Sequence, residues 1–402
     1  MPSRETRTVY CTILAQNYLP KAMTLAESLH RHHPDAELVV LLIDVLRDEE
    51  LPVVPDLPGM RLVSTAALGL SEREVLHLTT IYNLVEFATA IKPVLFQRLL
   101  EDADQAVYLD PDTYVTAPMG ELPVDLAASE GGILLTPHYL APVGTEGEFG
   151  EGHLLHVGVY NLGFCAFDRR AGAFLDWWWG HLENECLWDP MSGLFVDQKW
   201  VDLGAAFFAA TCWRHPGYNV SIANLHERPI VDEGDGYRIA TTGDPLRLYH
   251  FHAFDPSAPH ELSTRGTSST AHLRDSNKAL DALCLQYAEE LVKNAAALPV
   301  APPYPYDTDT RGRRISRQLR RAYRVESLKG AQLPLPFLPE EADAYEAWRR
   351  SAWKPMGREL VGDAIKSIRL VLPEEYGRVK DRFPALSQKV RSRFVRSSGI
   401  WG

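Results

Sequence analysis

The run Leu38 to Ile43 (LVVLLI) constrains the fold more than any other part of this sequence. Its uninterrupted apolar residues leave no polar face for solvent, as expected of a strand that is covered on both sides. Asp44 follows the run directly, and a similar short apolar run, Thr8 to Ala15, precedes it. Strands buried on both faces are typical of parallel sheets that are connected by helices.

The segments around these runs predict the helices that such a sheet needs. Residues 20–33 carry apolar positions at helical spacing, and residues 83–100 are mainly helical with a restart at Pro93. Two further apolar runs, 105–109 and 132–136, predict strands. This alternation predicts an α/β fold with a mostly parallel, Rossmann-like sheet and helices on both faces.

The rest of the chain suggests a second, mainly helical part. Residues 157–167 and 247–251 predict further strands of the main domain, which we expect to cover residues 1–275. Residues 276–402 form the expected helical extension, with a Pro-rich linker at 297–310.

Charge is distributed unevenly between these parts. Residues 1–300 carry 20 Lys and Arg against 41 Asp and Glu, whereas residues 301–402 carry 21 against 12. The acidic body argues against nucleic-acid binding. Residues 311–325 predict a basic amphipathic helix, either solvated or attached peripherally to an anionic bilayer.

The cysteines and the chain's start indicate a cytoplasmic protein, with peripheral contact at the inner face of the plasma membrane as an open alternative. The first residues lack the apolar core of a secretory signal, and no apolar stretch has the length of a membrane span. Five scattered cysteines predict reduced, mostly buried thiols rather than disulfides or a zinc site.

One of three Asp-x-Asp patterns has the context of a ligand site. The patterns are Asp102/Asp104, Asp110/Asp112 and Asp307/Asp309. Only the second follows a buried strand, and residues at i and i+2 of an extended chain point the same way. A divalent cation would relieve the repulsion between the two carboxylates, and substrate phosphates would complete the shell of Mg²⁺ or Mn²⁺. The alternative is an Asp-Pro-Asp turn that binds nothing.

A histidine is the natural third ligand. The predicted strand near residue 250 carries His250 and His252 on one face, and either could join the two carboxylates. An imidazole ligand favours Mn²⁺ somewhat over Mg²⁺. A single histidine in a strand is, however, more often structural.

An ordered set of short motifs resembles the family-8 type of GT-A glycosyltransferases, which includes bacterial lipooligosaccharide galactosyltransferases and glycogenin. The motifs are Ala15–Pro20, Ala88–Pro93, Tyr108–Asp112, Tyr160–Phe164, Asp197-Gln198 and His250-Phe251-x-x-Phe254. Each motif is weak alone, but their shared order over residues 8–256 is fairly specific. The resemblance implies a GT-A fold.

The resemblance also implies roles for individual residues. Asp110, Asp112 and His250 would bind Mn²⁺, or Mg²⁺, and through it the diphosphate of a UDP-sugar. Tyr18 would lie near the uracil and Lys92 near the ribose or phosphates. Asn161, Asp197 and Gln198 would line the donor sugar. From the residues alone, Asp197-Gln198 is a polar helix face and Asn161-x-Gly163 a bulge in a strand.

One element of the family pattern is missing. The expected Gly-x-x-Lys-Pro-Trp after the metal histidine is replaced by a segment containing Phe254-Asp255-Pro256. The lysine that would contact the leaving phosphate is therefore absent from its place. Arg228, Arg247 and Arg265 are open candidates for that role.

The implied activity is metal-dependent transfer of a hexose from a UDP-sugar to a glycan, a lipid-linked acceptor or another hydroxyl, in polysaccharide biosynthesis. The resemblance implies retention of the anomeric configuration. Because the Gln198 amide is a poor nucleophile, a front-face displacement is favoured over a covalent step at Asp197. The sequence identifies neither the sugar nor the acceptor.

Two other functions are alternatives. A nucleotidyltransferase or sugar-phosphate pyrophosphorylase would open with a Gly-rich phosphate loop, which residues 8–25 lack. A catalytically inactive sugar-nucleotide-binding protein would not need the set of Asp110, Asp112 and His250.

Overall fold

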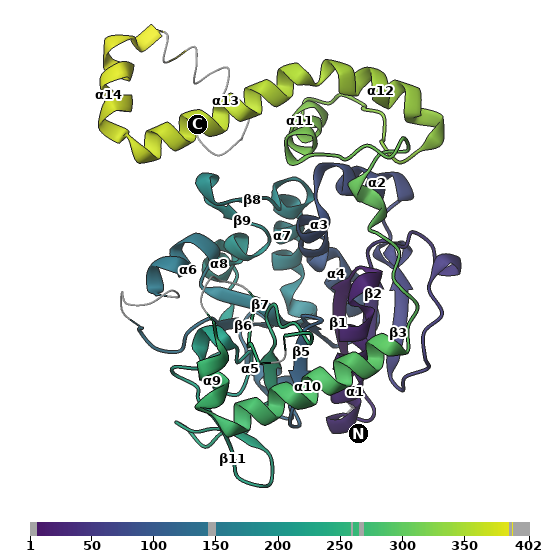
Figure 1. Cartoon of the computed structure of the whole chain (residues 1–402), viewed down its shortest axis with the longest axis vertical. Helices are drawn as coiled ribbons and strands as arrows, with labels where there is room; N and C mark the ends of the chain where they lie inside the picture. The colour runs from purple at the N-terminus through teal and green to yellow at the C-terminus, as the bar shows by residue number, and fades with distance from the viewer. Residues whose placement is uncertain (1–5, 144–149, 259, 265–268, 386–387, 389–402) are drawn as a thin grey trace. The chain divides into compact units, whose positions relative to one another are not determined.

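The computed structural model describes residues 6–143, 150–258, 260–264, 269–385 and 388, and its contacts group into two units (Figure 1). The first comprises Met1–Leu70, Ile91–Gly180 and Gln198–Pro303, and the second Ser71–Ala90, His181–Asp197 and Tyr304–Gly402. The units are interleaved along the chain. The assignment of residues 1–275 to one main domain therefore stays a prediction of the sequence.

The first unit is built on a mostly parallel sheet with the strand order β10-β6-β7-β4-β1-β2-β3. The strands are β1 (Thr8–Leu14), β2 (Glu37–Leu42), β3 (Met60–Ser64), β4 (Gln105–Leu109), β6 (Ile133–Pro137), β7 (Tyr160–Asp168) and β10 (Thr211–Cys212). β1 runs parallel to β2 and β4, and β2 parallel to β3, while β7 is antiparallel to both β4 and β6. The predicted α/β class and mostly parallel sheet are confirmed. The direction of β7 was not predicted, because an apolar run does not encode its direction.

Helices supply the cover that the apolar strands require. They are α1 (Leu19–His32), α4 (Lys92–Asp102), α5 (Leu122–Ala128), α6 (Glu151–Val157), α7 (Gly172–Glu185), α8 (Gln198–Phe207), α9 (Ala271–Asp275) and α10 (Lys278–Ala296). The predicted run of β2 is buried throughout, and its Val40 and Leu42 share a core with Leu25 and Leu29 of α1. α10 packs on α1, where Asn294 donates a hydrogen bond to Thr24 Oγ1 at 3.0 Å.

Short strands outside the main sheet complete the first unit. β5 (Thr113–Val115) pairs antiparallel with β13 (Leu248–His250), and β11 (Ile230–Asp232) pairs with β12 (Tyr237–Ile239). The pairing of β5 with β13 matters most for the candidate site. β5 directly follows the Asp-Pro-Asp segment, and β13 ends at the candidate histidine, His250.

The second unit contains the helices after Pro303, so the predicted helical C-terminal region is confirmed, whereas α10, which the prediction placed in the extension of residues 276–402, belongs to the first unit. Its elements are α2 (Glu72–Ile81), α3 (Leu84–Ala90), β8 (Trp188–Asp189), β9 (Leu194–Phe195), α11 (Arg317–Ser327), α12 (Ala342–Ser351), α13 (Trp353–Val371) and α14 (Pro373–Arg382). None of the helices in the described ranges is both long and apolar enough to cross a membrane.

The basic residues of α11 are not distributed as the sequence suggested. Arg320, Arg321 and Arg324 are buried in the second unit. Arg320 donates hydrogen bonds to the carbonyl oxygens of Thr79 and Tyr82, at 2.5 and 2.8 Å, and Arg321 pairs with Glu86. Residues 317–325 of the predicted helix are helical, whereas residues 311–316 are not. The idea that these arginines face solvent or a bilayer is wrong. They hold together the helices of this unit.

The five cysteines all lie in the described residues, where none of them forms a disulfide. Four of these thiols are buried, as expected from the sequence, and Cys212 is exposed.

Candidate metal centre

Asp110 and Asp112 lie in a tight turn at the carboxyl end of β4. The turn is closed by Thr113, whose backbone N–H and hydroxyl donate to Asp110 O at 3.0 and 2.7 Å. On the neighbouring strand β7, Gly163 O accepts a hydrogen bond from Asp110 N at 2.9 Å. The chain thus forms the Asp-Pro-Asp turn, and both side chains are partly exposed, to 29% and 13%.

Strand pairing brings His250 to these carboxylates from 138 residues further along the chain. His250 pairs with Thr113 in the β13–β5 register, and Phe251 N donates to Asp112 O at 2.8 Å. His250 Nε2 consequently lies 3.1 Å from Asp112 Oδ1 and 3.7 Å from Asp110 Oδ2. Among the residues that the structure describes, these three form the group that could hold a metal, with ligand atoms within 4.8 Å of one another.

The electrostatics of the three groups are tightly linked. Burial opposes the charged form of His250, but the charge and hydrogen bond of Asp112 and the charge of Asp110 outweigh it and raise the pKa of His250. Burial would likewise raise the pKa of Asp112, yet His250 and the charge of Lys21 hold it well below its usual range. A cation bound here would take the place of the proton on His250.

The donor set fits a small divalent cation. Adjacent ligands about 2.1 Å from an octahedral ion lie about 3 Å apart, which is close to the 3.1 Å between His250 Nε2 and Asp112 Oδ1. Two carboxylates and one imidazole suit Mn²⁺ or Mg²⁺, and the partly exposed carboxylates leave room for substrate oxygens.

Gly163 is required by the packing of the histidine ring. A Cβ atom at this position would lie 2.4 Å from His250 Cε1 and 2.5 Å from Nδ1. No side chain fits at that distance without moving the ring, so glycine allows His250 to reach Asp112.

The predicted bulge around Asn161-x-Gly163 is confirmed. Between the pairs Leu135–Cys165 and Pro137–Tyr160, β7 has extra residues that β6 does not match. Asn161 Oδ1 accepts a hydrogen bond from Gly163 N at 3.0 Å and so stabilises the bulge. The role of Asn161 at a donor sugar stays a prediction.

Lys92 connects to the metal centre through an aromatic ring. Its Nζ is buried, donates to Leu162 O at 3.2 Å and lies 4.3 Å from the centroid of the Tyr108 ring. The Tyr108 hydroxyl in turn donates to Asp110 Oδ1 at 2.8 Å. Lys92 therefore supports the strand that carries Asp110, and its contact with a ribose or phosphate stays a prediction.

Tyr18 and Lys21 follow the carboxyl end of β1, where Lys21 lies beside Asp112 and Tyr18 lies beside Lys21. Tyr18 is 41% exposed, and the turn before it is held by Asp44, whose carboxylate accepts from Gln16 N at 3.0 Å. Lys21 Nζ lies 4.4 Å from the centroid of the Tyr18 ring and 3.7 Å from Asp112 Oδ2. Lys21 was not predicted from the sequence, although its place in the first turn after a strand end was a usable signal.

The remaining predicted residues have more local roles in the structure. Gln198 begins α8, and its amide nitrogen donates to Val157 O at 2.8 Å, while Asp197 is buried immediately before that helix. Arg228 is buried and donates to the carbonyl oxygens of Tyr218 and His138 at 2.9 Å. These contacts make Arg228 a structural residue.

Arg247 also has other partners, because its guanidinium makes two hydrogen bonds to the Glu121 carboxylate, at 3.0 and 3.2 Å. Arg265 lies outside the described residues. Of the basic residues considered, it is therefore Lys21 that the structure places next to the two carboxylates.

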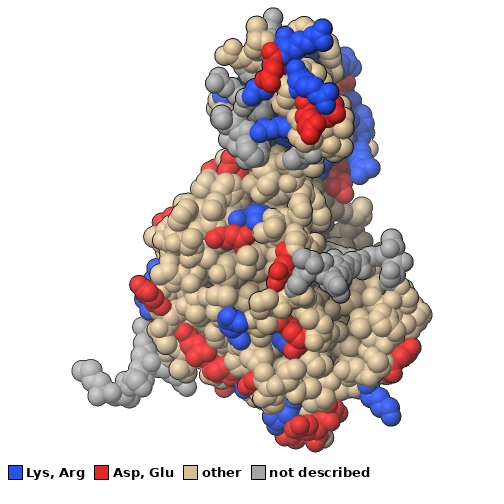
Figure 2. Space-filling view, turned by 90° about the vertical axis from the view of Figure 1, so that its left-hand side faces the viewer, with Lys and Arg blue, Asp and Glu red and all other residues tan. Residues whose placement is uncertain are grey.

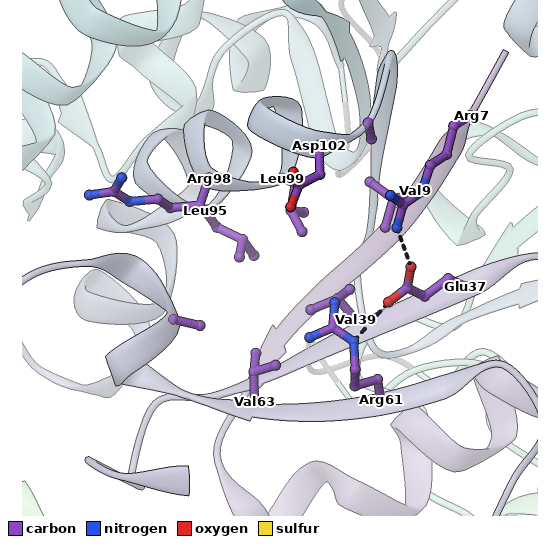
Figure 3. A pocket seen from close by; sticks show the side chains of 12 residues that line it. Arg7, Val9, Glu37, Val39, Arg61, Val63, Leu95, Arg98, Leu99 and Asp102 are labelled. Carbon is purple, nitrogen blue, oxygen red and sulfur yellow. Dashed lines mark hydrogen bonds and ion pairs between the residues drawn. The ribbon is translucent and has the colours of Figure 1, made fainter. Parts of the chain in front are cut away.

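A separate hollow lies near the amino ends of the strands, where β1 and β2 begin. It measures about 160 Å³, and its rim carries Arg7 and Arg61, which both pair with Glu37 (Figure 3). Since parallel α/β sheets bind ligands at the carboxyl ends of their strands, this hollow is not part of the candidate centre.

Comparison with known proteins gives distant relatives. No protein-family model matches the chain. YfnF, an uncharacterized protein of Bacillus subtilis (strain 168), is 26% identical over 251 residues, which cover 61% of this chain and 81% of YfnF. YfnD of the same organism is 23% identical over 256 residues, covering 61% of this chain and 77% of YfnD.

Several solved glycosyltransferase structures are similar to the chain at low identity. The galactosyltransferase LgtC, solved with donor and acceptor sugar analogs, is 16% identical with a TM-score of 0.38, covering 73% of this chain and 97% of LgtC. GlyE of Streptococcus pneumoniae TIGR4 is 14% identical with a TM-score of 0.41, covering 75% and 66%. Similarities of this size do not decide the activity, so the side chains around Asp110 must carry the functional argument.

Proposed function

We propose that the chain is a GT-A-type, family-8-like glycosyltransferase that moves a hexose from a UDP-sugar to a hydroxyl of a glycan or lipid-linked acceptor. The observation that carries this proposal is the convergence of Asp110, Asp112 and His250 at the carboxyl end of β4. In a mostly parallel sheet, that edge is where nucleotide ligands bind. Bacterial surface polysaccharide synthesis is the setting that fits such an activity.

The roles of the residues follow from their chemistry. Asp110, Asp112 and His250 would hold Mn²⁺, or Mg²⁺. When bound, the cation would offset the negative charge that builds up on the departing nucleoside diphosphate. Tyr18 offers an exposed ring for stacking with the uracil. Lys21 adds a positive charge beside Asp112. This charge would replace that of the lysine that the family pattern has after the metal histidine and that this chain lacks.

The proposed stereochemical course is retention by a front-face displacement. Gln198 is fixed by its hydrogen bond to Val157 O, and an amide is too weak a nucleophile for a covalent intermediate. The leaving phosphate would then accept the proton of the attacking hydroxyl. The buried Asp197 is the alternative nucleophile, and trapping a glycosylated Asp197 by mass spectrometry would overturn the front-face proposal.

The first experiment is a screen of UDP-sugars for release of UDP in the presence of Mn²⁺, with a chelator as control. In the same assay Lys21→Met is expected to raise the donor KM about 10–100-fold, since a hydrogen bond to a charged group contributes about 1.5–3 kcal/mol. Lys278→Met, which changes an exposed lysine on α10, is the matched control. Equal KM values for both variants would remove Lys21 from the site.

Peripheral membrane contact is part of the proposal, but through helices other than the one predicted. The large exposed apolar residues of α13 and α14, and of the residue that follows each helix, are Trp353, Leu360, Val361, Ile368, Val371, Leu372, Val379 and Phe383. Lys and Arg side chains, with Asp and Glu side chains between them, cover the same region at the top of Figure 2. An exposed apolar series among basic residues is typical of helices that lie on anionic bilayers.

Vesicle co-sedimentation tests this contact. We expect binding to vesicles that contain phosphatidylglycerol and much weaker binding to pure phosphatidylcholine. Ile368→Glu/Val371→Glu should reduce binding severalfold without unfolding the protein, because both side chains are exposed. Equal sedimentation of the wild type with both kinds of vesicle would contradict an anionic-surface contact.

A further inference from the structure

Asn219 is a buried residue in a strained backbone conformation, close to the metal centre. Its φ is 53° and its exposure 1%. The conformation is held from both sides, because Arg228 donates to Tyr218 O at 2.9 Å and Asn224 donates to Asn219 O at 3.2 Å. Strain of this kind persists only where the surroundings enforce it, and it gathers at functional sites.

The side-chain amide of Asn219 has one orientation that satisfies its neighbours. Its Nδ2 donates to Asn161 O at 2.9 Å and to Thr136 Oγ1 at 3.0 Å. A backbone carbonyl can only accept a hydrogen bond, so the amide nitrogen must face Asn161. The amide oxygen therefore faces His250, 3.0 Å from its Nδ1.

This contact decides which nitrogen of His250 carries a proton when a cation is bound. Because Asn219 Oδ1 can only accept, Nδ1 of His250 must be the donor. The lone pair is then on Nε2, the atom that lies 3.1 Å from Asp112 Oδ1. Ligating histidines generally have such a partner on their second nitrogen, which fixes both the tautomer and the ring orientation.

We propose that Asn219 is a positioning residue of the metal centre, which acts through His250 without touching the cation or the donor. The inference rests on the metal-dependent function proposed above. Asparagine combines two properties needed here: tolerance of the left-handed backbone and an amide that both donates and accepts. Glycine would supply only the first property, and aspartate would keep the acceptor but lose the two donated hydrogen bonds.

Two substitutions separate the backbone role from the role of the amide. Asn219→Gly relieves the strain but removes the acceptor for His250, so Mn²⁺ affinity should fall about 10–100-fold. Asn219→Asp keeps an acceptor for Nδ1 and should hold Mn²⁺ affinity within a few-fold of the wild type. The metal-free full chain is titrated with Mn²⁺ alone, and the concentration of free Mn²⁺ is measured by electron paramagnetic resonance.

Thermal unfolding of the same proteins provides the second readout. Asn219→Asp places a carboxylate against Asn161 O, so it should be less stable than Asn219→Gly. Asn219→Gly is therefore expected to be the more stable variant, and Asn219→Asp the variant that binds Mn²⁺ more tightly. A purely structural residue would give the same order in both measurements. Ala209→Gly, at another left-handed residue that is exposed, is the control and should leave Mn²⁺ affinity unchanged.

Each outcome has a definite meaning. A folded Asn219→Gly protein that binds Mn²⁺ as tightly as the wild type overturns the positioning role and leaves the proposed function intact. Parallel losses of affinity and stability in both variants overturn it as well, because they indicate a structural residue. A wild-type chain that does not bind Mn²⁺ overturns the proposed function, and this inference with it.

Discussion

Replacing Asp112 by alanine is expected to reduce UDP release from the donor sugar about 1000-fold or more. The carboxylate lies 3.1 Å from His250 Nε2, closer than the 3.7 Å between that atom and Asp110 Oδ2, and it belongs to the group of three that could hold the cation. Charge neutralisation of a leaving diphosphate by a metal contributes several kcal/mol, and each 1.4 kcal/mol is a factor of ten in rate. Initial rates of UDP release at saturating Mn²⁺ measure the effect.

Asp102→Ala is the matched control for this experiment. Asp102 also belongs to an Asp-x-Asp pattern, but it is exposed at the end of α4 and lies away from His250. Its replacement should leave the rate unchanged. If Asp112→Ala kept wild-type activity while remaining folded, the turn after β4 would not be the metal centre.

Replacing Glu86 by alanine is expected to destabilise the second unit by about 3–5 kcal/mol. Glu86 is 1% exposed, pairs with the buried Arg321 and accepts a hydrogen bond from Trp188 N at 2.8 Å. Removing the carboxylate leaves the Arg321 guanidinium charged and buried without its carboxylate partner, which is costly. Equilibrium unfolding in urea, followed by circular dichroism, measures the change.

Two comparisons make the origin of this loss specific. Glu374→Ala removes an exposed ion pair with Arg378 and should cost less than about 0.5 kcal/mol. Glu86→Leu/Arg321→Met replaces the pair with apolar side chains and should recover much of the lost stability. A Glu86→Ala effect as small as that of Glu374→Ala would contradict a buried, structural ion pair.

Much of the sheet and of the metal centre could be predicted from the sequence, because both depend on local patterns. Continuous apolar runs identified β1, β2 and β4, and the position of Asp110 at the end of such a run predicted its exposure at the ligand-binding edge. His250 was the predicted third ligand, with His252 as a rival; the choice between them depends on the β13–β5 register, which only the folded chain defines.

The role of Asn219 and the burial of the α11 arginines could not be predicted from the sequence, because both depend on tertiary contacts. Asn219 is recognised by a left-handed φ and by partners 58 and 83 positions away, and neither feature is visible as a periodic pattern. The arginines of α11 were expected to be solvated because charged side chains usually are. They are buried instead because carbonyl oxygens around the end of α2, and Glu86, provide partners that composition does not reveal.

Calorimetric titration of the wild-type chain with UDP, with and without Mn²⁺, tests the metal-dependent nucleotide site most directly. We predict measurable binding of UDP in the presence of Mn²⁺ and a loss of at least tenfold in affinity when the metal is removed by a chelator. UDP binding that is equally tight without metal, or absent under both conditions, would contradict a nucleotide-sugar site built on Asp110, Asp112 and His250.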